Sequence, residues 1–499
     1  MENRPYKEEQ DLKMRSKTSP KNKKKKKAPS KNREFAVITY SFLALFICLM
    51  GYFTYFQFEK SEDFIDNPYN TRQETFEQKV VRGKILAATG ETLAETISDD
   101  AGNDTRRYPY GSIFAHVVGY STHGKTGIES QANFDLLRSN VSIIEKTGNE
   151  IQGEKSIGDN VVTTLDYELQ LRAYDALGSY DGAVVVMEPA TGKILAMVSK
   201  PDFDPNTISE DWDTLTADTN TDAVLLNRAT QGLYPPGSTF KILTTLEYLN
   251  EHGTDEDYSY SCNGSFTVGN TTIHCHNNKS HGTQTLKQAF ANSCNSAYSS
   301  MGLDLDITQF AKLCDSLLFN TSLPTKFESS KSSFVLQSSD GDASIMSTSI
   351  GQGKTLVTPF HMALIVSAIA NDGVLMQPYV IDHTETYEGT VHEQNEPETY
   401  KQLISSENAA VLQEYMSAVV QNGTGQKLKG QSYEAAGKTG SAEFSSGTNA
   451  AHSWFVGYAH QEEKEDIAVA VLVEDSGVGS EYAVPIAKEI FDSYYENYE

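Results

Sequence analysis

The chain of 499 residues has little positive charge: 41 Lys and Arg stand against 67 Asp and Glu, and the formal net charge is −26. The positive charge is concentrated at the start. Residues 1–33 carry thirteen Lys or Arg against four Asp or Glu, so a net charge of about −35 is left for the rest of the chain. Such an acidic body disfavours polyanionic partners, and we expect no nucleic-acid binding.

Cysteine is also scarce, and its five positions are Cys48, Cys262, Cys275, Cys294 and Cys314. The second and third flank a β-like stretch, CNGSFTVGNTTIHC, where either a disulfide or two buried thiols would fit. The fourth and fifth are interpreted as separate buried positions. His274 and His276 beside Cys275 raise a zinc alternative, but neighbouring strand residues point to opposite faces, which disfavours one tetrahedral ion. We therefore predict no metal ion and no other cofactor.

Charge is absent from residues 35–58, FAVITYSFLALFICLMGYFTYFQF. This apolar run is long enough to cross a hydrocarbon core of about 30 Å as a helix. A cleaved signal peptide is the alternative, but no small-x-small cleavage pattern follows the run. The basic cluster before it predicts an uncleaved, single-pass anchor with a cytoplasmic N-terminus and everything after about residue 59 outside the cytoplasm.

The remainder shows no internal repeat of fixed period, and its pattern changes twice. Short β-like runs and polar turns are followed from Gly182 by a predicted β-hairpin, GAVVVMEPATGKILAMVS. Helical stretches are predicted at residues 238–250, 285–301, 359–371 and 406–421, with an earlier one at 129–138. Strands return in AHSWFVGYA and DIAVAVLVED. This order predicts one α+β domain whose sheet is assembled from distant segments.

A serine and a lysine stand three residues apart where GLYPPGSTFK opens a predicted helix. Ser238 and Lys241 are then neighbours on one helical face. A serine hydroxyl needs a base to become a nucleophile, and a lysine can serve when burial disfavours its charged form. The plain alternative is a helix-capping serine followed by an ordinary lysine.

Two further short motifs follow along the chain. Ser293 and Asn295 flank Cys294 in a predicted helix and could direct a hydroxyl and an amide into one site. The triplet Lys-Thr-Gly occurs three times, beginning at Lys125, Lys146 and Lys438. The first two copies lie in turn-like polar stretches, whereas the last is predicted on a hairpin strand. It also follows Ser-x-x-Lys and Ser-x-Asn in that order.

This ordered trio is the pattern of penicillin-binding proteins and class A β-lactamases. The chain resembles a class B penicillin-binding protein, a peptidoglycan D,D-transpeptidase, and the resemblance covers nearly everything after the apolar run. VVRGKILAATGETLAET, RRYPYGSIFAHVVGYST, MEPATGKILAMVSKPDFDPN, SIGQGKTLVTPFHMA, AGKTGSAE and HSWFVGYA are similar to successive landmarks of that family.

The resemblance implies an α+β penicilloyl-serine transferase fold: an antiparallel sheet covered by helices, with an all-helical lobe. A β-rich pedestal and a single transmembrane helix would precede it. The implied domains are a basic cytoplasmic tail (1–34), the anchor (35–58), the pedestal (59–170) and the transpeptidase domain (171–499).

The resemblance also implies roles for individual residues. Ser238 would be acylated, Lys241 would be its base, and Ser293 and Asn295 would relay a proton and bind the substrate amide. Lys438 would contribute to the relay and to binding of the substrate carboxylate. The adjoining positions implied in substrate binding are Thr439, Gly440 and Ser441, and the oxyanion hole would consist of the N–H groups of Ser238 and Ser441.

The implied ligands are peptidoglycan stem peptides and β-lactams, and the implied partner is a separate SEDS-type glycosyltransferase in the membrane. Division, elongation and sporulation are all compatible roles. A D,D-carboxypeptidase or β-lactamase remains an alternative, as does a silent β-lactam sensor or scaffold, although 33 polar cytoplasmic residues disfavour a sensor. One departure is Ala87-Ala88-Thr89-Gly90, where the family has Asp-Arg-x-Gly, which removes charges from the pedestal. Another is Ser441, which replaces a threonine.

Overall fold

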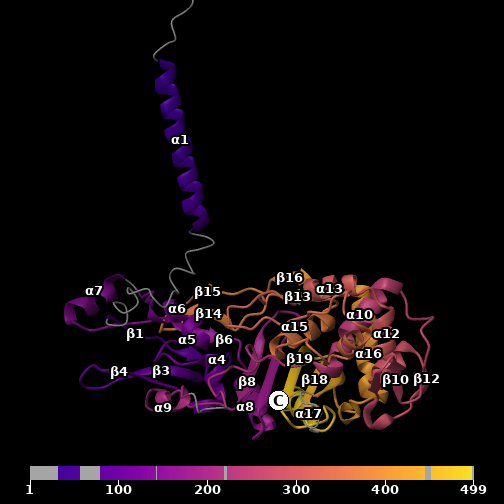
Figure 1. The fold of residues 1–499 in the computed structure, drawn as a ribbon. Helices are drawn as coiled ribbons and strands as arrows, with labels where there is room; N and C mark the ends of the chain where they lie inside the picture. Colours follow the sequence, from indigo (N-terminus) through magenta and orange to yellow (C-terminus); the bar gives the residue numbers. More distant parts are fainter. Residues whose placement is uncertain (1–31, 57–78, 142, 218–221, 444–450, 497–499) are drawn as a thin grey trace, which may run out of the picture. The chain divides into compact units, whose positions relative to one another are not determined.

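The computed structural model describes residues 32–56, 79–141, 143–217, 222–443 and 451–496, and the chain divides into two compact units, Met1–Ile65 and Asp66–Glu499. In the first unit, helix α1 spans Asn32–Tyr55 and is exposed along its length (Figure 1). Among the described residues it is the one helix long and apolar enough to span a membrane, with a mean hydropathy of 2.0. It is compatible with the predicted anchor, whose last two residues lie outside the described part.

The N-terminal part of the second unit is built on a six-stranded sheet of order β15-β14-β6-β2-β3-β4. Its strands are β2 (Ile85–Leu86), β3 (Thr92–Ser98), β4 (Asp104–Arg107), β6 (Asn160–Thr163), β14 (Ile381–Glu385) and β15 (Val391–Gln394). Two of these strands come from residues 381–394. The sheet therefore contains segments from both regions predicted as the pedestal and the transpeptidase domain.

Short elements surround this sheet. They are β1 (Val80–Val81) paired with β5 (Ser156–Ile157), the 3₁₀ helix η2 (Gly111–Phe114), and the helices α4 (Ala115–Val118), α5 (Gly127–Gln131), α6 (Asn133–Leu137) and α7 (Ile143–Gln152). The single helix predicted at 129–138 is thus two short helices, because Ala132 leaves helical geometry between them. The Lys146 triplet lies in a helix and not in a turn.

A buried ion cluster holds this region together. The Glu129 carboxylate is fully buried and lies 2.7 Å from Arg82 Nε and 2.7 Å from Arg106 Nε. Arg82 also donates to Asn133 Oδ1, and Arg106 donates to the carbonyl of Gly83. Burial opposes ionisation of Glu129, but the two guanidinium charges outweigh it and lower the carboxyl pKa. The pedestal region keeps an internal ion cluster despite its uncharged Ala87–Gly90 turn.

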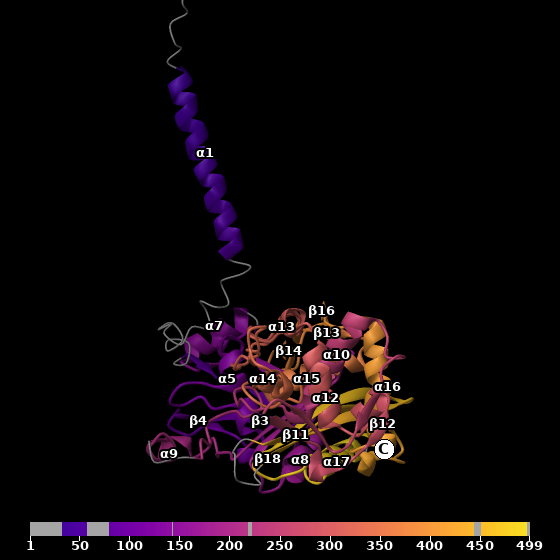
Figure 2. The same cartoon turned by 45° about the vertical axis from the view of Figure 1, so that its right-hand side comes forward.

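The second sheet has five strands in the order β17-β18-β19-β7-β8 (Figures 1 and 2). The strands are β7 (Gly182–Met187), β8 (Ile194–Lys200), β17 (Glu434–Glu443), β18 (Ala451–Gln461) and β19 (Lys464–Val473), all paired antiparallel. The predicted hairpin is confirmed as β7 and β8, and the sheet does join segments distant in the chain. β17, which carries the third Lys-Thr-Gly triplet, is an edge strand.

Both faces of this sheet are covered by helices. Along β7, Val185 and Met187 pack into one core, whereas Val184 and Val186 pack into another on the opposite face. Helices α8 (Tyr167–Leu177) and α17 (Ala483–Glu496) cover the second face. Because both faces are buried, these strands read as continuous apolar runs without polar alternation.

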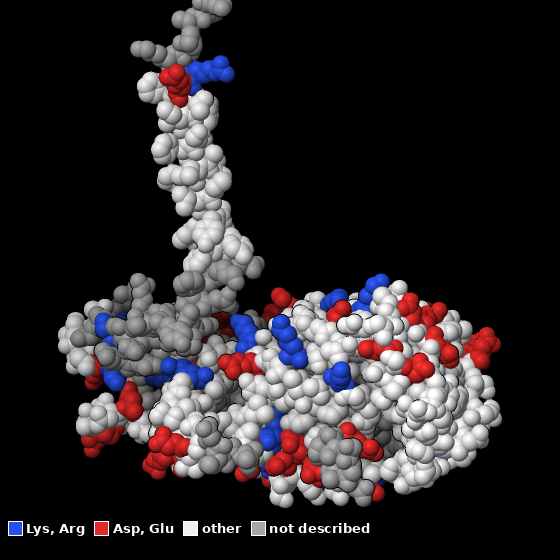
Figure 3. Space-filling model, in the orientation of Figure 1, with Lys and Arg blue, Asp and Glu red and all other residues white. Residues whose placement is uncertain are grey.

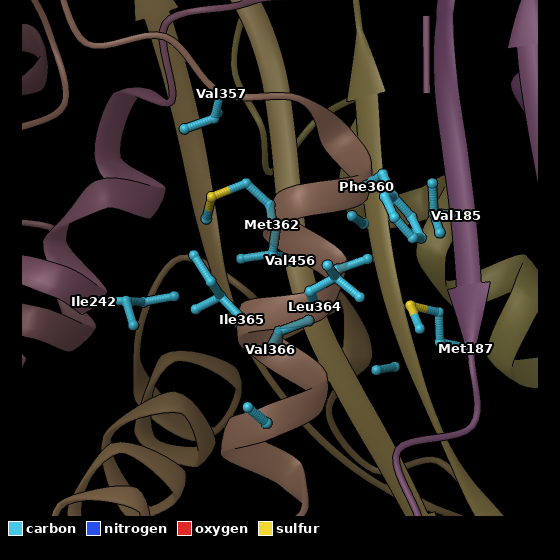
Figure 4. Packing of buried hydrophobic residues seen from close by; sticks show 14 of the residues in the cluster. Val185, Met187, Ile242, Val357, Phe360, Met362, Leu364, Ile365, Val366 and Val456 are labelled. Carbon is cyan, nitrogen blue, oxygen red and sulfur yellow. The ribbon is translucent and has the colours of Figure 1, made fainter. Parts of the chain in front are cut away.

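Helix α15 (Pro359–Ala370) packs against the first face (Figure 4). Thr358 caps it by accepting from the His361 N–H, and a proline stands at its first turn. Apart from His361 and Ser367, its side chains are apolar on every side of the helix. Phe360 lies beside Val185 of β7, Leu364 lies on the side of Met187 of the same strand, and Met362 lies near Val456 of β18 (Figure 4). The helix is therefore a central core element, and it separates the sheet from α10.

The remaining elements form a largely helical lobe. Helix α9 (Ile208–Leu215) is the exception, because it packs with Ala115 of α4, Tyr120 and Phe203. The elements of the lobe are η3 (Gly237–Phe240), α10 (Lys241–His252), β9 (Tyr260–Cys262), β10 (Ser265–Val268), β11 (Thr271–His274), η4 (His276–Asn278), β12 (Gly282–Gln284), α11 (Leu286–Ala291), α12 (Asn295–Asp304), α13 (Ile307–Ser316), α14 (Asp342–Thr348), β13 (Val374–Met376), β16 (Thr399–Gln402), α16 (Ser406–Asn422) and η5 (Gln426–Leu428). The helix predicted at 285–301 is in fact α11 and α12, broken at Ser293.

Charged side chains are spread over the surface. Figure 3 shows acidic groups over much of one face, interspersed with Lys and Arg. Several of the ion pairs are partly solvated, and in the pair of Lys287 with Glu414 both side chains are exposed, keeping 41% and 62% of their accessible surface. Pairs of this kind contribute little to stability. The acidic surplus is thus carried mainly by solvated side chains.

Candidate active site

The candidate nucleophile lies in a 3₁₀ turn that enters α10. Gly237 has a φ of 52°, and its N–H donates to the carbonyl of Gly351. The indole of Trp454 on β18 donates to the carbonyl of Pro235 at 3.1 Å, which ties the turn to the sheet. Ser238 is the second residue of this turn. Its Oγ lies 2.9 Å from Lys241 Nζ, so the predicted serine and lysine do face each other.

The Ser-x-Asn motif sits in the break between α11 and α12. Ser293 has a φ of 52°, which stops α11 and turns the chain toward Lys241. Lys241 Nζ lies 2.9 Å from the Ser293 carbonyl, 3.2 Å from Ser293 Oγ and 2.7 Å from Asn295 Oδ1. The Asn295 amide also donates to the carbonyl of His274 at 2.9 Å. The break therefore presents both side chains of the motif to one lysine.

The third motif completes the cluster from the sheet edge. Lys438 on β17 is fully buried, and its Nζ donates to Ser293 Oγ at 3.0 Å and to the Thr439 carbonyl at 3.0 Å. Ser293 Oγ thus lies between two lysine amines. Of the three Lys-Thr-Gly copies, the one at 438 makes these contacts; Lys125 precedes α5, and Lys146 lies in α7.

The residues after Lys438 adjoin the nucleophile turn. A Cβ on Gly440 would come within 2.9 Å of Thr239 Cγ2 and 3.1 Å of the Pro236 carbonyl, so this strand can approach the turn only with glycine here. Gly237 is likewise packed against the Ser441 backbone. The Thr439 hydroxyl hydrogen-bonds to that of Thr424, and Ser441 Oγ accepts from the Gly479 N–H.

Both lysines are buried without a carboxylate within ion-pair distance among the described residues. Burial lowers the pKa of Lys241 to about 7. Burial and then the charge of Lys241 lower the pKa of Lys438 well below its usual range. The Ser293 carbonyl and Asn295 Oδ1 can only accept, so they take two N–H bonds from Lys241. When Lys241 is neutral, its lone pair is left for the Ser238 hydroxyl.

The lowered lysine pKa predicts a pH dependence. The base form of Lys241 predominates above about pH 7. Acylation of Ser238 by a penicillin should therefore slow about tenfold per pH unit below 7 and level off above it. The second-order acylation rate constant between pH 5.5 and 9 measures this. A rate that is flat across the range, with the chain folded throughout, would contradict a titrating Lys241.

Several features of the site were not predicted from the sequence. Cys294 is not a separate buried position: its Sγ lies 3.7 Å from Cys275 Sγ. Cys262 and Cys275 are both free, with their Sγ atoms 3.7 Å apart, so the disulfide alternative is not what the structure has. The hydrogen bond from the Asn295 amide to the carbonyl of His274 could not be predicted from the sequence, because every residue has a backbone carbonyl.

Comparison with known proteins agrees with this geometry. The model described as the penicillin binding protein transpeptidase domain matches residues 182–492, and the penicillin binding protein A dimerisation domain matches residues 82–161. The chain belongs to the penicillin-binding protein transpeptidase family. The first match alone spans more than half of the chain.

Relatives at the level of whole chains support the same conclusion. The peptidoglycan D,D-transpeptidase PbpA of Mycolicibacterium smegmatis is 30% identical over 488 residues, covering 92% of this chain and 98% of the relative. The peptidoglycan D,D-transpeptidase MrdA of Acinetobacter baumannii is 29% identical over 456 residues, covering 78% and 66%.

Solved structures are similar as well. The D,D-transpeptidase domain of a peptidoglycan glycosyltransferase from Eggerthella lenta has a TM-score of 0.75 at 30% identity, covering 84% of this chain and 99% of that one. Penicillin-binding protein A from M. tuberculosis, as a penicillin G acyl-enzyme complex, has a TM-score of 0.74 at 27% identity, covering 83% and 99%. The predicted fold class and the resemblance to class B penicillin-binding proteins are confirmed, as is the prediction of a serine-type D,D-transpeptidase.

Proposed function

We propose that this chain crosslinks peptidoglycan stem peptides through an acyl-enzyme on Ser238, with Lys241 as the base. The observation that carries the assignment is the position of Lys241 Nζ, 2.9 Å from Ser238 Oγ and within hydrogen-bond distance of Ser293 and Asn295. Family membership supplies the reaction type. The hydrogen bonds support the role proposed for each residue.

In the first half-reaction, Ser238 Oγ attacks the carbonyl carbon between the two terminal D-alanines, and its proton passes to Lys241 Nζ. The oxyanion of the tetrahedral intermediate would accept from the N–H groups of Ser238 and Ser441, a contribution of about 3 kcal/mol per donor in comparable sites. Collapse breaks the C–N bond. The leaving amine takes a proton through the Ser293 hydroxyl, which lies 3.2 Å from Lys241 Nζ and 3.0 Å from Lys438 Nζ.

In the second half-reaction, an amine of a neighbouring stem peptide attacks the ester carbon of the acyl-enzyme. Lys241 removes the proton of the amine, the C–O bond to Ser238 breaks, and the serine recovers its proton. Asn295 would hold the amide of the donor peptide. The terminal carboxylate would bind beside Thr439 and Gly440, with Lys438 supplying positive charge. A β-lactam would acylate the same serine, but its leaving nitrogen stays covalently attached to the acyl group and is not released as D-alanine is. It therefore stays where the acceptor amine has to attack, and the cycle stops at the acyl-enzyme.

For the topology, we propose that α1 anchors the chain with residues 1–34 in the cytoplasm and residues 59–499 outside. The excess of nine positive charges in residues 1–33 supports this orientation. The proposed domain limits are 59–170 for the pedestal and 171–499 for the transpeptidase domain. We further propose a SEDS-type glycosyltransferase as the membrane partner, because a crosslinking enzyme needs glycan strands made by a polymerase.

The test uses the full chain in detergent with uncrosslinked glycan strands supplied by a separate polymerase. Released D-alanine and crosslinked muropeptide dimers are both counted. We expect the two to appear in equal amounts, and Ser238→Ala to abolish both while the exposed control Ser338→Ala leaves both unchanged. D-alanine without dimers would indicate a carboxypeptidase, and absence of both, together with no covalent penicillin adduct, would indicate a scaffold.

A further inference from the structure

Four side chains with metal-binding atoms meet directly behind the Ser-x-Asn loop. They are Cys262 at the end of β9, Cys275 after β11, His281 before β12 and Cys294 between α11 and α12. One ligand atom from each lies within 4.8 Å of every other. Their spacing in the chain is Cys-x₁₂-Cys-x₅-His-x₁₂-Cys. The cluster is not part of the reaction proposed above.

The distances fit a tetrahedral ion. Zinc binds cysteine sulfur at about 2.3 Å and histidine nitrogen at about 2.05 Å, so a regular tetrahedron has S···S edges of about 3.8 Å and S···N edges of about 3.6 Å. Cys262 Sγ lies 3.7 Å from Cys275 Sγ, and Cys275 Sγ lies 3.7 Å from Cys294 Sγ. Cys262 Sγ lies 3.5 Å from His281 Nδ1. Three edges of the tetrahedron are already formed.

A disulfide explains the cluster less well. A bonded pair of sulfurs is separated by about 2.05 Å, and all three cysteines are free here. With three thiols in one cluster, a disulfide between any two would leave the third without a partner and the imidazole unused. Three sulfur ligands and one imidazole are the set that selects zinc among the common divalent ions.

Each of the three sulfurs has a polar group beside it. The Gly264 N–H donates to Cys262 Sγ at 3.3 Å, and the Ala297 N–H donates to Cys294 Sγ at 3.5 Å. The Ser296 hydroxyl lies 3.1 Å from Cys275 Sγ. Each sulfur therefore has a donor beside it, as ligating sulfurs usually have.

The segment that supplies three of the ligands has few buried side chains, although its half-buried Tyr258, Tyr260 and Ile273 pack against the main core. Residues 258–284 form two small two-stranded sheets, β10 with β11 and β9 with β12. From residue 251 to residue 283, Cys262 and Cys275 are the only buried side chains, and Gly264 is the only other buried residue. Hairpins this short are not stable on apolar burial alone. A bound metal ion would link these hairpins to one another and so stabilise them where few side chains are buried.

The cluster is joined to the active site through the chain itself. Cys294 stands between Ser293 and Asn295, both of which contact Lys241 Nζ. The residue before Cys275 is His274, whose carbonyl accepts from the Asn295 amide. Two of the four ligands are therefore adjacent to groups that set the position of the Ser-x-Asn loop.

We propose that Cys262, Cys275, His281 and Cys294 bind one Zn²⁺ ion that holds the Ser-x-Asn loop against Lys241. The sequence predicted no metal ion, because His274 and His276 are poorly placed for one tetrahedral ion. The histidine of the proposed site is His281, which lies beyond the η4 turn. The ion acts on position and takes no part in bond making. Binding of the ion is independent of the proposed function, and only its effect on acylation rests on that function.

The experiment measures zinc and acylation separately on the full chain, purified in detergent under reducing conditions without chelator. Elemental analysis should find about one zinc per chain, and cobalt substitution should give the d–d absorption of a tetrahedral thiolate site. Cys262→Ser should lose the metal and slow acylation by a fluorescent penicillin between 10- and 100-fold, as loss of positioning partners does. The control Cys314→Ser, at a buried cysteine outside the cluster, should keep both.

Two further variants keep the outcomes distinct. His281→Cys preserves four ligands and should retain the zinc and most of the acylation rate, which loss of packing alone would not predict. Ser238→Ala should retain the zinc and lose acylation; acylation that persisted there would contradict the proposed function without touching the metal. A metal-free chain with a disulfide between two of these cysteines, or equal zinc in the parent and Cys262→Ser, would overturn the metal site.

Discussion

Lys241→Met is expected to slow acylation of Ser238 by about 10³-fold, within the range of general-base contributions. Methionine fills a similar volume but has no lone pair of comparable basicity, so the serine proton has no acceptor. The hydrogen bonds of Lys241 to Ser293 and Asn295 are lost as well. The measurement is the second-order rate constant for labelling by a fluorescent penicillin, on chains whose thermal unfolding has been checked.

The matched control is Lys312→Met, an exposed lysine on α13, which should label at the parent rate. The residual activity of Lys241→Met should also lose the rise with pH around 7. If the variant labelled within a factor of ten of the parent and kept that pH profile, another group would have to be the base, and Lys438 would be the next candidate.

Glu129→Gln is expected to lower the free energy of unfolding by about 3–5 kcal/mol, because it leaves two buried guanidinium groups without a counter-charge. Glu129 lies 2.7 Å from both Arg82 and Arg106 and is fully buried. Urea unfolding of the full chain in detergent measures the loss. Glu414→Gln, which breaks the exposed pair with Lys287, should change stability by less than about 1 kcal/mol.

The effect of Glu129→Gln should itself depend on pH. The pKa of Glu129 is lowered in the folded chain, so its contribution is complete above the ordinary carboxyl pKa and is lost as the pH falls through the folded value. The difference between parent and variant should therefore shrink on acidification. A difference that stays constant down to strongly acidic pH would show that the variant acts through packing and not through charge.

Much of the fold follows from local patterns in the sequence. The continuous apolar runs predicted the strands β7, β8 and β19 of one sheet, and a helix was predicted at 359–371, where α15 lies. The order of Ser238, Ser293 and Lys438 along the chain was enough to select one Lys-Thr-Gly copy from three. These features can be predicted because the spacing of apolar residues, the turn residues and the spacing of motifs all belong to contiguous stretches of sequence.

Features set by distant contacts were not predicted. The break at Ser293 falls among weak helix formers, residues 292–296 (NSCNS), but these residues do not fix where the helix stops or which way the chain turns. The turn is set by contacts of the loop with Lys241 and with Lys438 on β17. Cys294 was predicted to be buried apart from Cys262 and Cys275, because no local pattern indicates that it contacts the hairpins of β9 to β12. The spacing of apolar residues in a helix gives no indication that one residue within it, here Ser293, has a positive φ.

The six-stranded sheet has a consequence for how such a protein can be recombined. Strands β14 and β15 at residues 381–394 complete a sheet that otherwise comes from residues 85–163. Exchanging the N-terminal region with that of a relative would therefore pair foreign strands with resident ones, in a register set by side chains chosen for the original partner. The six-stranded sheet is discontinuous in sequence, and a functional chimera would have to carry both of its segments together.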